Sequence, residues 1–94
     1  MSQQPVKPVD PQLEILVVEE AIITLQGKVV AAQNNLFSAQ KMRDESEPGS
    51  ASESIAETEI EEICSQIDVH NAEIDRLEKE HRALLIQIHF SLIS

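Results

Sequence analysis

The chain has 94 residues and carries 17 Asp and Glu against 7 Lys and Arg, a formal net charge of −10 that repels nucleic-acid phosphates. Aromatic residues make up 2% of the chain, with no Trp or Tyr on which bases could stack. We therefore expect no nucleic-acid binding, and a chain of this length has room for one domain at most.

The first predicted helix follows a short N-terminal segment that has no apolar periodicity. Residues 1–9 include two prolines, and we expect them to form an extended or mobile arm. Asp10 can then cap a helix by accepting a backbone hydrogen bond, and Pro11 suits the first helical position. We predict a helix from about residue 11 to about residue 46.

One face of this helix is apolar at alternating steps of three and four residues, which is the spacing of a coiled-coil seam. The alternation holds without a fault from Ile15 to Ala39. Gly27 lies off the seam and costs the helix about 1 kcal/mol relative to alanine. The first seam consists of Ile15, Val18, Ile22, Leu25, Val29, Ala32, Leu36 and Ala39.

A break in the pattern separates this helix from a second one. Pro48 cannot continue a helix, and Gly49 permits a positive φ, so we expect a loop over about residues 47–52. A regular seam then resumes, which predicts a second helix over about residues 53–90. The second seam consists of Ala56, Ile60, Ile63, Ile67, His70, Ile74, Leu77, His81, Leu84, Ile88 and Ser91.

The two ends of the second helix are less defined by the sequence than its middle. Its start has the spacing of a capping box twice, as Ser50 with Glu53 and as Ser54 with Glu57. Its end passes into an apolar tail over residues 91–94, and the letters QIHFSLIS also fit a short alternating strand.

The two seams match each other when the chain is folded back at the Pro-Gly break. Seam residues whose numbers sum to 99 then face one another, for example Ile15 with Leu84 and Leu25 with Ile74. We therefore predict an all-α fold, an antiparallel helical hairpin with a coiled-coil-like seam, in a single domain over residues 10–94.

A second apolar column on the first helix has no place in such a hairpin. Its members repeat every seven residues about 100° around the helix from the Ile15 column, beyond a strip of Glu19, Gln26, Gln33 and Gln40. Because a two-helix hairpin covers one stripe of each helix, we expect the column to mediate assembly into an inter-chain helical bundle, most simply a dimer. The predicted oligomer interface is Leu16, Ile23, Val30 and Phe37, and the residues predicted to bind a partner are Phe90, Leu92 and Ile93.

Two histidines occupy seam positions that are otherwise apolar. His70 and His81 are about 16 Å apart along one helix, so they cannot bind the same ion within one chain. They could face each other between two copies. Separately, either could act as a proton switch, since charging an imidazole in an apolar seam is unfavourable and acid would loosen the bundle. The alternative is that each ring packs at the seam margin and bonds a neighbouring Glu or Gln.

No catalytic or metal-binding motif occurs in the chain, so we expect no enzymatic activity, no cofactor and no metal site. The longest apolar patch is interrupted by polar residues and is too short to cross a membrane, so no membrane partner is expected. Cys64 is the only cysteine, which excludes an internal disulfide and is typical of the reducing cytoplasm.

Two functions fit these observations. The first is an oligomeric assembly protein, such as an adaptor, scaffold or chaperone-like protein, that binds itself and another protein through its leftover apolar faces. The second is an oligomeric protein that sequesters an anionic, nucleotide-like small molecule at an inter-chain pocket. For the second function the expected ligand-binding residues are Lys28, His70 and Asn71.

Overall fold

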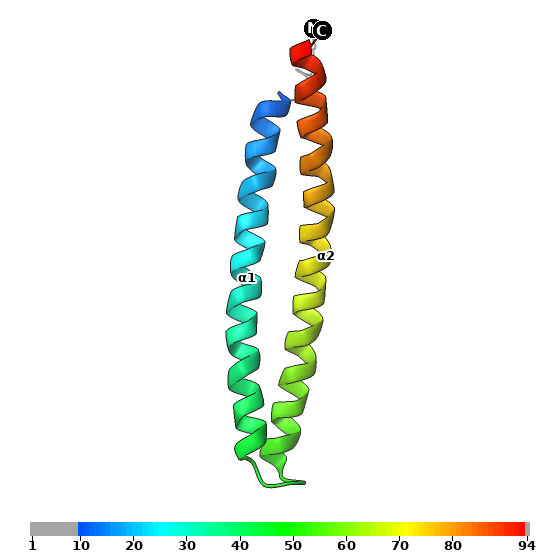
Figure 1. Cartoon of the computed structure of the whole chain (residues 1–94). Helices are drawn as coiled ribbons and strands as arrows, with labels where there is room; N and C mark the ends of the chain where they lie inside the picture. The colour runs from blue at the N-terminus through cyan, green and yellow to red at the C-terminus, as the bar shows by residue number, and fades with distance from the viewer. Residues whose placement is uncertain (1–9, 94) are drawn as a thin grey trace, which may run out of the picture.

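The computed structural model of the chain describes residues 10–93, and these residues form two long helices joined by a short loop. Helix α1 spans Pro11–Glu45 and helix α2 spans Ala51–Ile93. Figure 1 shows them lying side by side in opposite directions, with the loop at one end. The described residues contain no strand, so the predicted all-helical hairpin is confirmed, while the predicted arm over residues 1–9 lies outside the described part.

The start of α1 has the predicted cap. The Asp10 side chain accepts a hydrogen bond of 3.0 Å from the backbone N–H of Gln12, and its carbonyl accepts those of Leu13 and Glu14. Pro11 takes the first helical position, where its missing N–H leaves no bond unmade. At the other end the backbone N–H of Ser46 bonds the Arg43 carbonyl, so the helix ends at Glu45, one residue before the predicted end.

The loop turns on Gly49, whose φ of 78° lies in the left-handed region that glycine adopts without strain. Ser50 Oγ accepts the backbone N–H of Glu53 at 3.2 Å, and Glu53 Oε1 accepts the backbone N–H of Gly49 at 3.1 Å. Of the two predicted capping boxes, the structure therefore uses Ser50 and Glu53. Because Ser50 is the cap, α2 begins at Ala51, two residues earlier than predicted.

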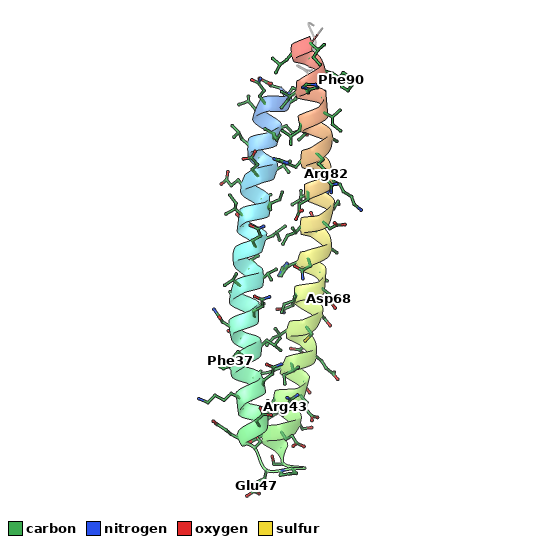
Figure 2. All side chains as sticks on the ribbon, viewed as in Figure 1. Phe37, Arg43, Glu47, Asp68, Arg82 and Phe90 are labelled. Carbon is green, nitrogen blue, oxygen red and sulfur yellow. The ribbon has the colours of Figure 1, made fainter. Side chains whose placement is uncertain are left out.

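The interface between the helices follows the two predicted seams (Figure 2). All eight seam positions of α1 are buried or half-buried, and so are those of α2 except for the exposed Ser91. The core near the open end consists of Ile15, Val18, Leu77 and Leu84. Pairing by numbers that sum to 99 places Ile15 against Leu84, and both belong to this core.

The C-terminal end of α2 differs from the prediction. The helix runs to Ile93, so residues 91–93 are helical rather than an apolar tail, and the strand interpretation of QIHFSLIS is wrong. The helix continues to Ile93 because no Pro or Gly follows Gly49 in the sequence that could end it earlier. With 43 residues against 35, α2 extends past the start of α1 (Figure 1). Within the described residues, neither helix contains a stretch long and apolar enough to span a membrane.

Candidate interaction surface

The predicted second column of α1 faces solvent. We call Leu16, Ile23, Val30 and Phe37 the outer column, and their exposed fractions are 59, 67, 56 and 70%. Heptad spacing brings these four side chains onto one line along α1, and Figure 2 shows Phe37 near the loop-side part of that helix. The hairpin itself therefore leaves uncovered the apolar line that the sequence assigns to an oligomer interface.

The surroundings of the outer column carry very little charge. Between residues 21 and 40, Lys28 is the only charged side chain of α1. Helix α2 is different, because its exposed side holds acids and bases that pair with one another. In α2 the ammonium of Lys79 lies 3.3 Å from Asp75, and Arg76 contacts both Glu73 and Glu80. The outer side of α2 is thus charged and solvated. The middle of α1 is nearly neutral, and the charged residues beside the outer column, Glu19, Glu20 and Lys41, lie near its ends.

A second exposed apolar region lies where α2 extends past α1. The predicted partner-binding residues Phe90, Leu92 and Ile93 are all exposed there, and the rings of His89 and Phe90 meet edge to face with their centroids 6.2 Å apart. The sequence pattern places the predicted partner-binding residues on α2 alone, whereas Leu13 and Val17 of α1 are also exposed at this end. The exposed apolar side chains at this open end are Leu13, Val17, Leu85, Ile86, Phe90, Leu92 and Ile93.

The two seam histidines face α1 of their own chain. Nε2 of His81 lies 3.1 Å from Oε1 of Glu19, a hydrogen bond that joins the two helices. His70 is half-buried in the same seam. Because α1 covers the side of α2 that holds both rings, a direct pairing of His70 with His81 of another copy would require the hairpin to open. The geometry fits a histidine that packs at the seam margin and bonds a neighbouring carboxylate.

The residues proposed for an anionic ligand are not all brought together. Lys28 lines an open groove of about 550 Å³ together with Glu20, Glu73 and Arg76, but His70 and Asn71 do not line it. Heptad spacing explains the separation, because Lys28 and Asn71 lie on opposite sides of the seam. An anion in this groove would meet the carboxylates of Glu20 and Glu73 beside the cations.

Arg76 in this groove is also engaged already. Its Nε donates to Glu73 Oε2 at 3.0 Å, and this hydrogen bond lowers the pKa of the Glu73 carboxyl, helped by the charge of the guanidinium. The same contact raises the pKa of Arg76. In this groove only Lys28 is therefore available to bind an anion. A single lysine provides few of the charged hydrogen bonds by which proteins bind phosphate groups.

The described residues contain no group of three or more His, Cys, Asp or Glu side chains that could hold a metal ion. Cys64 is a free, exposed thiol on α2. No family model, no curated protein and no solved structure matches the chain. The exposed apolar side chains of the outer column and of the open end are therefore the features that indicate a function.

Proposed function

We propose that this protein is a non-enzymatic interaction protein whose hairpin packs against the helices of another chain to form an inter-chain bundle. The partner is a second copy of the chain, a different protein, or both, as for an adaptor, scaffold or chaperone-like protein. The observation that carries the proposal is the outer column: four large apolar side chains in one line, each more than half exposed. Exposed apolar side chains are ordinary when scattered, whereas a contiguous line marks a contact surface.

The energetic reason is the hydrophobic effect. Full burial of a Val, Leu, Ile or Phe side chain contributes roughly 1.5–3 kcal/mol, and the hairpin realises less than half of that at each outer-column position. A partner helix laid along the column would recover much of the remainder. Along the middle of the column, burying the neighbouring Gln side chains and Lys28 costs less desolvation free energy than burying the charged residues that form the ion pairs of α2.

The apolar open end offers a second contact, built from α2 residues such as Leu92 and Ile93. Its α2 residues lie on the other helix from the outer column, so they can contact a different partner while the column is occupied. We further propose a reducing compartment such as the cytoplasm, because the only cysteine of the chain is a free thiol.

The test compares three proteins by light scattering and circular dichroism. The wild type should have an oligomeric mass, and the double variant Ile23→Glu with Val30→Glu should be monomeric, because two charges on the column cannot be buried without partners. The matched control is Val69→Glu on α2, since Val69 is 66% exposed and Ile23 67%. This control should keep the wild-type mass.

If the wild type is monomeric, the same three proteins serve as bait for host proteins. A helical protein held by the wild type and by Val69→Glu, but lost by the double variant, supports an interaction with a different protein. A wild-type monomer whose host binding is the same for all three baits contradicts the proposed function.

A further inference from the structure

We infer that the outer column pairs with the outer column of a second copy, with the two α1 helices antiparallel about a two-fold axis between Gln26 and Gly27. This inference rests on the proposed function and names the partner and the arrangement. The column is self-complementary in this direction. An axis between residues 26 and 27 places each residue opposite the one whose number completes a sum of 53, so Leu16 meets Phe37 of the second copy and Ile23 meets Val30. A two-fold contact needs such pairing, in which residue i faces j and j faces i.

This register is the one that engages the whole column. Moving one helix by a heptad in either direction pairs three of the four positions and leaves one large side chain at each end without a partner. The axis also falls beside Gly27, where a Cβ would meet nothing within 4 Å in the hairpin. The absent side chain at that point lets the two backbones approach closely in the centre of the contact.

The polar residues beside the column favour the antiparallel direction over the parallel one. In a parallel pair Glu19 of each copy would lie beside Glu20 of the other, which places like charges together in the contact. In the antiparallel pair Glu19 lies on the same flank of the contact as Gln33 of the second copy, and Glu20 lies on the same flank as Asn34, at nearly the same height. Each carboxylate then meets an amide that can donate a hydrogen bond.

The charge of the whole hairpin favours the same direction. The loop end, residues 39–62, holds eight acids against Lys41 and Arg43, a net charge of −6. The open end, residues 10–20 with 81–93, holds four acids against Arg82, a net charge of −3. A parallel pair sets the two loop ends side by side, whereas the antiparallel pair separates them by about 30 Å of helix or more, roughly three times the Debye length of roughly 10 Å.

The contact is long enough for a dimer of ordinary size. Residues 12–41 of the two copies face each other in this register, which is about 45 Å of helix. A standard interface buries about 800 Å² of surface on each partner. Over this length that area corresponds to a strip about 18 Å wide, which is roughly one and a half times the helix diameter of about 10–12 Å. The flanking Gln and small side chains must therefore take part together with the outer column.

The experiment measures the distance between nitroxide labels in the dimer by pulsed dipolar electron paramagnetic resonance. Cys64 is first replaced by serine, and Lys41→Cys or Ser38→Cys then receives the label. In the antiparallel pair the labels at position 41 are separated by 29 residues along the axis, about 44 Å, and those at position 38 by 23 residues, about 35 Å. Moving the label should therefore shorten the distance by about 9 Å.

A parallel pair gives distances below about 20 Å at both positions, because each label then lies beside its counterpart at helix spacing. Such short distances would overturn the inferred arrangement and leave the proposed interaction function standing. A wild-type monomer without dipolar coupling also overturns it, and the host baits described above then decide the proposed function separately. A dimer whose distance lengthens from position 41 to position 38 excludes this register.

Discussion

At the scale of single residues, one of the two seam histidines forms a hydrogen bond between the helices. His81 stands where a coiled-coil seam normally has an aliphatic residue, and it bonds Glu19 on the facing helix. The imidazole keeps 27% of its surface exposed and the Glu19 carboxylate 49%, so both polar groups remain in contact with water. The hydrogen bond links the helices, but it replaces apolar burial that a leucine would provide.

We therefore predict that His81→Leu stabilises the protein. The leucine buries apolar area in the seam, while the freed Glu19 carboxylate is solvated and loses little. A gain of about 1 kcal/mol is expected, which raises the unfolding midpoint by about 4–8 °C for a domain of this size. Thermal unfolding at pH 7 and one fixed protein concentration measures it; a lowered midpoint would mean that the bond to Glu19 contributes more than the packing.

A second prediction compares two leucines of α2 that differ in burial. Leu77 lies in the core and is 7% exposed, whereas Leu85 lies off the seam and is 47% exposed. Leu77→Ala should destabilise the protein by about 2–4 kcal/mol, because it removes a packed side chain and leaves a cavity. Leu85→Ala is the control and should change the free energy of unfolding by much less. Equal effects in chemical denaturation would contradict the assignment of the seam.

At the scale of the elements, the features that depend on neighbouring residues could be predicted from the sequence. The cap at Asp10 and Pro11 needs only adjacent residues, and the seam needs only the alternation of three and four. The position of Gly49 in the turn is equally local, since glycine tolerates its positive φ.

Features that depend on a choice between similar local signals could not be predicted. Ser50 and Ser54 have the same relation to a following glutamate, and the structure decides for Ser50 because the turn at Gly49 places its hydroxyl at the helix start. The end of α2 is similar: the alternation in QIHFSLIS fits a strand, but no partner strand exists among the described residues, and the helix continues.

Placement of side chains around the helices was predicted in part. The exposure of the outer column follows from its angle to the seam, and the structure places all four of its residues in solvent. The expected ligand residues Lys28 and Asn71 lie at the same height along the hairpin, since their numbers sum to 99. Height does not determine the side of the seam, and the groove that contains Lys28 is lined by Glu73 and Arg76 instead.

At the scale of the whole molecule, the hairpin is a thin object with two unlike sides. A two-helix layer has one internal seam, and nine hydrophobic residues of the described part are buried in it. Among residues 10–93, fourteen large apolar side chains are exposed, more than the number of buried hydrophobic residues. Such a balance is typical of a protein that completes its core with another chain.

A completed core couples folding to association, and the coupling can be measured on the wild type alone. When folded chains associate and unfolded chains do not, a higher protein concentration stabilises the folded state by mass action. A monomeric hairpin has no such dependence, so its unfolding midpoint is the same at every concentration.

The most direct measurement is therefore the unfolding midpoint of the wild type, followed by circular dichroism over a hundredfold range of protein concentration. We predict that the midpoint rises steadily with concentration and that the double variant Ile23→Glu with Val30→Glu abolishes the rise. A high, cooperative midpoint that stays constant over the whole range would contradict the claim that a second copy covers the outer column.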